Sequence, residues 1–498
     1  MEANELNLAH SHFFRVEEES DWLIFNVDCG SSLPAYRIFH VRDPLGRLRY
    51  QHLDISSPRT VTIHRDPFKT NFNGVGGAIP AGEWRIDFGS KPTTFKLHYE
   101  YGNGALSYKY RPSIPDPARD IWATEFDRSG RFMLNLYDWE SSREEGSRWY
   151  KGDCHLHTML SDGSLPPSEL NRQAQTAGLD FIVATDHFIV PTSWPQADLL
   201  VIPGIEVTAS CGHWNALGPR TWIDWNGNLA DGGMTTEQGM NRVIRDASDS
   251  GAVCSINHPL DPSFEWTLHD TDLSRIDAVE IVNSPENRIS KEANDQTLVL
   301  WNTMWNEGLR KTGIGGSDFH LNLAPHEGGK EYCVGSPTTC VFASRLSAHE
   351  ILDGIRAGRV CVTIGPELEP TIQVDDTVYL PGTDLTEAIK ASADGIVRCH
   401  LSISGMNAGQ LHWIENGERV QTVEIGDGGG TFMATFDWKN RDYVWARAEV
   451  RSVDGELLGF TNPVSCGSKT TDVKTWGQAM VKAGLKQGPL QPPGGAGW

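Results

Sequence analysis

The chain contains 498 residues, more than one compact domain usually holds, and this length predicts about three domains. Hydrophobic residues make up 39% and charged residues 22%, as in globular proteins that bury a sizeable core. The 65 acidic and 43 basic residues give a net charge of −22, which argues against long nucleic acid or an anionic membrane as a partner. No apolar run of about 18 residues is present, so no membrane span is expected.

Nine cysteines are scattered along the sequence, and no two have the C-x-x-C spacing. Several stand in apolar runs, among them Cys254 and Cys340. The odd count and this placement favour free buried thiols over a disulfide framework. Residues 1–5 also lack the basic and apolar start of a secretion signal. We therefore expect a cytoplasmic protein.

Residues 1–147 have the pattern of an N-terminal β-sandwich-like domain. Short alternating runs at 22–27 and 60–63 predict strands. Turn residues at 43–46 and 80–82 separate such runs. Strands at this spacing are typical of a sandwich.

Residues 148–365 change to strands that alternate with helices. Apolar runs predict seven buried strands near 153–157, 181–185, 200–207, 252–257, 278–283, 312–316 and 338–343. Helical patterns lie between several of them, at 167–177, 237–248, 290–307 and 347–357. Helical crossovers join parallel strands, so we expect an α/β domain, most simply a (β/α) barrel.

After residue 365 the chain returns to short strands with Gly and Asp turns. Residues 366–466 therefore predict a C-terminal β-sandwich-like domain. The tail, 467–498, is rich in Gly, Pro and Lys, and we expect it to be disordered or to lie on the surface.

Residues 152–163 (GDCHLHTMLSDG) hold the strongest sign of chemistry. In a strand, residues i and i+2 point to one face, so His155 and His157 converge. Asp162 stands in the loop that leaves this strand. Three potential metal ligands therefore meet at one strand end.

Further potential ligands stand at or just past the C-terminal ends of later strands. They are His187, Glu206, His213, His258, Asp318 and His320. Barrel enzymes build their sites from these strand ends. A single histidine there is usually only a hydrogen-bonded residue, but six histidines and three carboxylates at matching positions predict a metal site. Asp186 points away from His187, and we expect it to orient a ligand instead of binding metal.

Two other patterns lack this support. The pair His10 and His12 has no downstream acid and no α/β context, so we interpret it as structural. No G-x-S-x-G segment or Ser-His-Asp order is found, so a serine hydrolase is not expected.

Four residues are candidates for substrate contact, each with a structural alternative. Asn257 and Asn283 end strands, and either touch substrate or satisfy backbone groups. Arg220 either contacts an anionic substrate or forms a surface salt bridge. Trp214, with Trp222 and Trp225 after it, either lines an aromatic pocket or covers the barrel rim.

The segments HLHTMLSDG, ATDH, GIEVT with GHWNALG, INHP and GGSDFH resemble the successive motifs of the PHP superfamily. This superfamily of metallohydrolases is named for its polymerase and histidinol phosphatase members. Within it, residues 148–153 (RWYKGD) and the outer β domains resemble the carbaryl-hydrolase-like group.

This resemblance implies a distorted seven-stranded (β/α) barrel with two or three divalent metal ions. His155, His157, Glu206 and Asp318 would hold the first ion. Glu206 would bridge to a second, completed by His213 and His258, and Asp162, His187 and His320 would hold the third. Manganese, zinc and iron all suit this mixed ligand set.

The implied chemistry is hydrolysis by a hydroxide that bridges the metal ions, since coordination brings the pKa of a bound water to about 7. Three ions, three carboxylates and one hydroxide leave a charge of about +2, which attracts an anion. We therefore expect a phosphoesterase that acts on a small phosphate ester, and leave formation of a homo-oligomer open.

Two alternatives compete with this interpretation. The carbaryl-hydrolase-like flanks and the tryptophan-rich loop favour hydrolysis of a carbamate or carboxylic ester by the same cluster. The metal site could instead be structural, within a binding protein. A structural zinc, however, normally has a closed shell of four ligands, often with cysteine.

Overall fold

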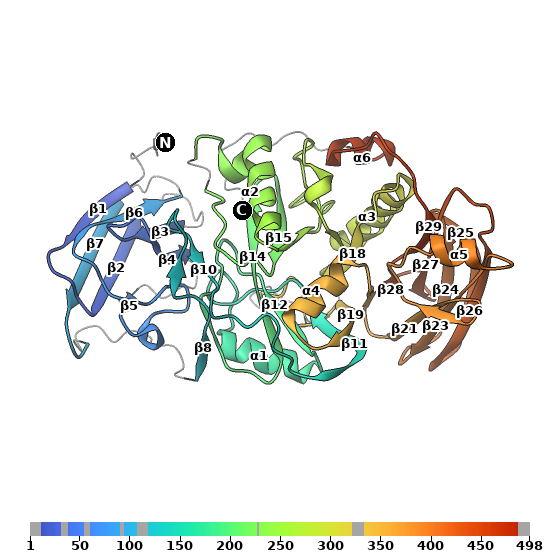
Figure 1. The fold of residues 1–498 in the computed structure, drawn as a ribbon, viewed down its shortest axis with the longest axis horizontal. Coiled ribbons are helices and arrows are strands. Elements are labelled where there is room, and N and C mark those ends of the chain that lie inside the picture. The colour runs from blue at the N-terminus through green and yellow to red at the C-terminus, as the bar shows by residue number, and fades with distance from the viewer. Residues whose placement is uncertain are drawn as a thin grey trace.

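The computed structural model describes residues 11–30, 38–53, 60–89, 94–106, 118–226, 229–320 and 333–486. Three parts follow one another along the longest axis, as Figure 1 shows. A β-rich part formed by the early chain lies at one end, a mixed α/β part lies in the centre, and a second β-rich part lies at the other end. The domain limits expected at residues 147, 365 and 466 stay predictions.

The N-terminal part contains two antiparallel sheets that share one core. Their orders are β1-β6-β3-β4 and β5-β2-β7. Phe14, Leu23, Phe25 and Trp84 are among the side chains buried in this core. The elements are β1 (Ser11–Val16), β2 (Trp22–Gly30), β3 (Ile38–Arg42), β4 (Leu48–Leu53), β5 (Thr60–His64), η2 (Pro67–Lys69), β6 (Gly82–Phe88), β7 (Thr94–Gly102), β8 (Arg119–Ile121), β9 (Glu125–Phe126) and β10 (Phe132–Met133).

The central part contains the four predicted helices and a strand at or beside each of the seven predicted strand positions. The elements are β11 (Glu145–Asp153), α1 (Pro167–Thr176), β12 (Phe181–Ala184), β13 (Ser193–Pro195), β14 (Leu200–Ala209), β15 (Gly212–Leu217), η3 (Gly233–Thr235), α2 (Glu237–Asp249), β16 (Val253–Ile256), η4 (Leu273–Arg275), β17 (Ala278–Asn283), α3 (Arg288–Asn306), β18 (Thr312–Gly316), β19 (Thr338–Arg345), α4 (Ala348–Arg356) and β20 (Val360–Thr363). The first of these strands, β11, begins within the segment expected to belong to the N-terminal domain and ends before His155.

Side-chain caps define where these helices begin. Thr236 accepts a hydrogen bond from the backbone of Gly239 at the start of α2, and Ser347 accepts one from Glu350 at the start of α4. In α1 a proline occupies the first turn, where its missing N–H costs nothing. No helix within the described ranges is both long enough and apolar enough to cross a membrane.

The prediction of an all-parallel sheet is wrong, because β15 runs antiparallel to both of its neighbours. The parallel pairs are β11 with β12, β12 with β14, β16 with β17, and β17 with β18. Between them, β15 pairs antiparallel with β14, where Thr208 faces His213, and with β16, where Trp214 faces Ile256. Only residues 210–211 separate β14 from β15, too few for a helical crossover. β19 is also antiparallel to β11.

The strands from β11 to β18 pair in the order β11-β12-β14-β15-β16-β17-β18. The segments that follow β11 and β18 contact each other. The backbone N–H of Asp318 donates to the His155 carbonyl at 2.8 Å, and that of His157 donates to the Phe319 carbonyl at 3.1 Å. Leu156 and Phe319 form a parallel bridge between these segments. The pairing places two groups of predicted ligands side by side, while a closed barrel stays a prediction.

The central sheet continues into the C-terminal part. β20 pairs with β28, and the order then runs β28-β27-β24-β25. A second sheet, β22-β21-β23-β26, shares a core with it that includes Leu368, Leu401 and Trp413. The elements are β21 (Glu367–Val374), β22 (Thr377–Tyr379), α5 (Thr386–Ala391), β23 (Ile396–Ser404), β24 (Gly409–Glu415), β25 (Glu418–Ile425), β26 (Gly429–Asp437), β27 (Tyr443–Ser452), β28 (Leu457–Thr461), β29 (Val464–Gly467) and α6 (Trp476–Lys482).

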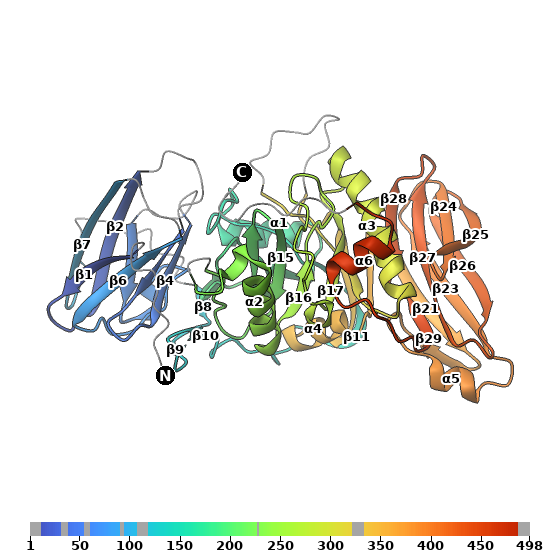
Figure 2. The same ribbon diagram turned by 90° about the horizontal axis from the view of Figure 1, so that it is seen from above.

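The expectation of a disordered or surface tail is wrong for its first half. Thr475 and Gln478 form a reciprocal capping box that starts α6. Trp476 and Met480 are buried in the core of the central part, and α6 lies against α3 (Figure 2). Residues 487–498 lie outside the described ranges.

The N-terminal part packs directly on the segment that follows His187. The Gln51 side chain accepts a hydrogen bond from Val190 N at 3.0 Å and donates one to Val190 O at 2.9 Å. The His40 ring lies 5.2 Å from the Trp222 ring and 5.1 Å from the Trp225 ring. Trp222 and Trp225 therefore lie in the contact between the N-terminal and central parts instead of lining an open pocket.

Asn462 should be a main link between the central and C-terminal parts. Its buried side chain accepts from Gly313 N at 2.7 Å and donates to Gly313 O at 2.8 Å and Val360 O at 3.1 Å. We expect Asn462→Ala to lower the free energy of unfolding by about 2–4 kcal/mol, because it leaves buried backbone groups unsatisfied. Urea denaturation measures this change. Gln421→Ala on the exposed face of β25 is the control, with a change below about 0.5 kcal/mol; equal midpoints for the two variants would contradict this assignment.

Candidate metal centre

The nine predicted ligands meet at one end of the central sheet. The parallel strands present their C-terminal ends here, and β15 presents its N-terminal end, which carries His213. The strand β11 ends at Asp153, before His155 and His157. Both histidines nevertheless face the cluster, and Leu156 between them packs in the hydrophobic core. Three groups of these residues each bring their ligand atoms within 4.8 Å of one another, and a fourth such group joins His155 and His258 to Glu280.

Glu206 occupies the middle of the cluster and is completely buried. Its Oε1 lies 3.3 Å from His155 Nε2, 3.3 Å from His213 Nδ1 and 3.6 Å from His258 Nε2. Its Oε2 lies 2.7 Å from His187 Nδ1 and 3.5 Å from His157 Nε2. One carboxylate therefore faces histidines on both sides, as a bridging ligand requires.

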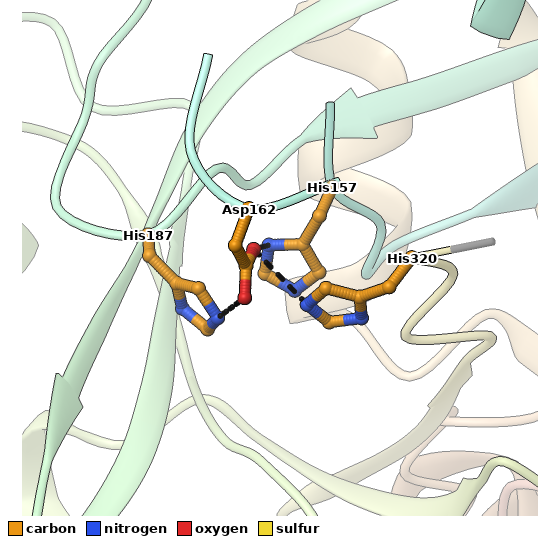
Figure 3. A group of neighbouring side chains, drawn as sticks. All are labelled: His157, Asp162, His187 and His320. Carbon is orange, nitrogen blue, oxygen red and sulfur yellow. Dashed lines mark ion pairs between the residues drawn. The ribbon is translucent and has the colours of Figure 1, made fainter. Parts of the chain in front are cut away.

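Asp162 organises a second group, shown in Figure 3. Its Oδ1 lies 3.2 Å from His320 Nε2 and 3.9 Å from His157 Nδ1, and its Oδ2 lies 3.4 Å from His187 Nε2. The side chains of Asp162, His320 and Asp318 are 14%, 16% and 19% exposed, whereas Glu206 is fully covered. The cluster therefore opens to solvent on the side of these three residues.

Backbone strain accompanies the ligands at two strand ends. Asp318 has φ of 54° and His258 has φ of 28°, both in the left-handed region that residues with a Cβ rarely adopt. Asp318 Oδ1 thereby reaches His157 Nε2 at 3.0 Å and His155 Nε2 at 3.3 Å. Strain of this kind concentrates at functional sites, where the surrounding structure holds it in place.

The donor set fits divalent metal ions. Imidazole nitrogens and carboxylate oxygens are the ligands that zinc, manganese and iron accept. His155 Nε2 and His157 Nδ1 are buried, and neither has an aligned hydrogen-bond partner among the described residues. Buried polar atoms are normally satisfied, so these nitrogens indicate where metal ions would bind.

Nearby carboxylates raise the pKa values of two histidines in the cluster, and burial lowers those of two others. Burial alone would lower the pKa of His155, but carboxylates, foremost Asp318 and Glu206, raise it well above its ordinary value. Burial likewise opposes the rise in the pKa of His187, which Asp162 and Glu206 produce. By contrast, burial lowers the pKa of His157 to about 3 and that of His213 to about 4.

Asp186, Asn257 and Asn283 act behind the ligands. Asp186 accepts hydrogen bonds from Thr158 N, Thr158 Oγ1 and Ser161 Oγ, so it holds the loop that carries Asp162. Asn257 donates to Glu206 Oε1 at 3.0 Å, and Asn283 donates to Glu280 Oε2 at 3.1 Å. All three are buried and support neighbouring groups within the protein.

For Arg220 and Trp214, the structure favours a structural role over the alternative of substrate contact. Because β15 is antiparallel, its C-terminal end points away from the cluster, and Arg220 follows that end. The Arg220 guanidinium lies 4.8 Å from the centre of the Trp139 ring. Trp214 is 0% exposed and belongs to the central hydrophobic core.

Sequence reasoning missed three buried residues at the centre. Glu280 Oε1 lies 3.0 Å from His155 Nδ1, and Thr208 Oγ1 lies 2.6 Å from His187 Nδ1. Asp153 accepts hydrogen bonds from Ser317 N, Ser317 Oγ and Gly335 N, which ties β11 to the end of β18. A carboxylate inside the apolar run of β17 was the available signal for Glu280. His12 lies on β1, apart from this centre, and His10 lies outside the described residues.

No family model matches the chain, and no curated protein matches it. Among solved structures, it is similar to a two-domain protein from Bacteroides vulgatus that contains a predicted PHP-like metal-dependent phosphoesterase, with 18% identity, coverage of 66% of this chain and 98% of that one, and a TM-score of 0.34. A candidate metal-dependent phosphoesterase from Bifidobacterium adolescentis has 16% identity, coverage of 41% and 94%, and a TM-score of 0.28. An amidohydrolase from Chromobacterium violaceum with bound sulfate has 16% identity, coverage of 36% and 90%, and a TM-score of 0.23. At these TM-scores the likenesses carry no conclusion about this chain.

Metal binding should release protons at pH 7. The neighbouring carboxylates raise the pKa values of His155 and His187, so we expect these rings to carry a second proton in the metal-free protein and to lose it when metal binds. We expect release of about one to two protons, and an affinity for metal that falls as the pH falls. Calorimetric zinc titrations in two buffers of different ionisation enthalpy measure the number. An affinity independent of pH between 6 and 8 would contradict this.

Asp186→Ala should weaken metal binding without a change of any predicted ligand. The substitution removes all three hydrogen bonds that hold residues 158–161, and we expect the affinity of the Asp162 group to fall by about 10–100-fold. Zinc titration with elemental analysis measures this. Ser161→Ala removes one of these bonds and a 3.3 Å contact with Asp162 Oδ1, and it should still have a smaller effect. Equal losses in both variants would argue against a supporting role for Asp186.

Proposed function

We propose that this chain is a metal-dependent hydrolase that cleaves small phosphate esters. One observation carries the proposal: six histidines and three carboxylates from distant parts of the sequence converge around the buried Glu206. A structural metal site needs only four ligands in a closed shell. This cluster is larger, and it opens to solvent at Asp162, Asp318 and His320.

The proposed ligand groups are those that the PHP resemblance implies, and the close side chains around Glu206 and Asp162 support them. His155, His157, Glu206 and Asp318 would hold one ion, and Glu206, His213 and His258 a second. Asp162, His187 and His320 would hold a third. Manganese, zinc or iron bound there would supply a hydroxide nucleophile at neutral pH and positive charge to stabilise an anionic transition state.

Residues around the metal ligands would hold these ligands in position and exclude bulk water from the metal ions. Asn257 fixes one oxygen of Glu206, and Asp186 fixes the loop of Asp162. The fully covered Glu206 side keeps bulk water out, so an ester would enter from the side of Asp162 and His320.

The net charge of the loaded cluster supports a phosphate ester as substrate. Three divalent ions outweigh three carboxylates, so a small anion would be attracted although the whole chain is acidic. Carbamates and carboxylic esters are the competing substrates. The proposal also includes a cytoplasmic location and no long nucleic acid as partner, and it leaves a homo-oligomer open. The eight cysteines from Cys154 to Cys466 are free thiols.

Glu206→Gln and His157→Ala should each lower turnover to below about 1% of wild type. Substitution of a residue that only hydrogen-bonds to a metal ligand already lowers metal affinity or activity by about 10–100-fold, and these two residues would be ligands themselves. Elemental analysis should show a matching loss of metal while circular dichroism stays unchanged. Arg220→Ala, at the opposite end of the sheet from the cluster, should keep turnover within about twofold of wild type. Wild-type turnover by either ligand variant would rule out the assignment.

A panel of esters tests the substrate class with the same preparations. Aryl phosphate mono-, di- and triesters are compared with aryl acetates and N-methylcarbamates on metal-loaded protein. We expect the largest kcat/KM for a phosphate ester. A larger kcat/KM for any carbonyl ester than for every phosphate ester would overturn the proposed substrate class and favour the competing one.

A further inference from the structure

Glu280 is a buried carboxylate that the proposed chemistry does not yet use. It lies on β17, between β16 and β18, and its side chain is 1% exposed. A charge at such a position is costly unless neighbouring groups satisfy it. Its surroundings therefore show which residues depend on it.

Three nitrogen groups surround Glu280. One belongs to the ring of a predicted ligand, and the other two lie at the ends of β16 and β17. Its Oε1 lies 3.0 Å from His155 Nδ1. Its Oε2 accepts hydrogen bonds from the His258 backbone N–H at 2.8 Å and from Asn283 Nδ2 at 3.1 Å. One carboxylate thereby contacts the ring of one predicted ligand and the backbone of another.

Glu280 also lies close enough to His155 and His258 to form a candidate metal group with them. The hydrogen bonds argue against this use. With a proton on Nδ1, His155 donates to Glu280, and its Nε2 lone pair stays available for a metal ion beside Glu206 and Asp318, each 3.3 Å away. A metal ion on Glu280 would have to replace the bonds that hold His258 and Asn283.

We propose that Glu280 is a positioning residue that holds His155 in its Nδ1–H form and fixes the backbone of His258. This inference rests on the metal centre of the proposed function. Hydrogen bonds of this kind behind a metal-bound histidine set its tautomer and its ring orientation. Through the same carboxylate, the ligands in the segments after β11 and β16 keep a fixed separation.

The packing of β18 supports this role. A Cβ atom on Gly316 would lie 2.6 Å from Glu280 Oε1 and 2.3 Å from His155 Cβ. The backbone of β18 therefore covers the Glu280–His155 pair closely, with no room for a side chain. The pair is held on that side and excluded from solvent.

Glu280→Gln tests the proposal with little change of volume. Glutamine offers one acceptor oxygen, so its NH₂ group would face a donor where Glu280 accepts three bonds. We expect the zinc affinity, measured by calorimetric titration, to fall by about 10–100-fold. Glu449→Gln is the matched control, because Glu449 is also buried and bonded to Arg447 and Arg451 in the C-terminal part; its zinc affinity should equal that of wild type.

A nitrogen NMR spectrum of the zinc-loaded protein provides a second readout. With ¹⁵N-labelled histidine, the signal absent from His155→Ala should show a proton on Nδ1 in wild type. A proton on Nε2, or a crystal structure with a Glu280 oxygen at about 2.0–2.2 Å from zinc, would overturn the proposal. So would unchanged zinc affinity in Glu280→Gln, and if that variant fails to fold, the wild-type spectrum decides.

Neither readout requires turnover, so the two proposals can fail separately. A protein that binds zinc with the expected tautomer but hydrolyses no ester refutes the proposed function and supports the role of Glu280. A protein that hydrolyses esters, with Glu280→Gln binding zinc as wild type does, refutes only the role of Glu280.

Discussion

Glu206 is a charge that solvent does not reach, and the central part is built around this constraint. Removing a carboxylate from water costs several kcal/mol unless nearby charges and hydrogen bonds compensate. Five imidazoles lie between 2.7 and 3.6 Å from its oxygens, and Asn257 adds a hydrogen bond. These groups come from β15 and the segments after β11, β12 and β16, so the strand order and the site depend on each other.

The reversed strand β15 explains why residues close in sequence have different environments. Its first residues, with His213, lie at the end of the sheet where the ligands gather. Residues after Leu217 lie at the opposite end, where Arg220 stacks on Trp139. The hairpin also places Gly212, at φ of 123°, where an added Cβ would lie 2.6 Å from the Trp266 ring. A tight turn therefore brings His213 back towards Glu206.

Periodicity and strand-end position were sufficient to predict the four central helices, the positions of the main strands and the gathering of nine side chains. They predicted no strand at β15, because polar His213 and Asn215 interrupt its apolar pattern and only two residues separate it from β14. Glu280 was missed because its partners, His155 and His258, are distant in sequence. Tryptophan is a residue type that often lines binding sites, and only the burial of Trp214 shows that it belongs to the core. Likewise, Trp476 anchors α6 although the surrounding sequence is typical of a flexible tail.

The shared sheet has a consequence for any attempt to isolate the central part. β20 is bonded to β19 on one edge and to β28 on the other. A chain shortened after residue 365 would leave the second edge unsatisfied, and such bare edges recruit strands from other molecules. The C-terminal β-rich part thus protects the central part from self-association, and fragments cut at this point would be prone to aggregate.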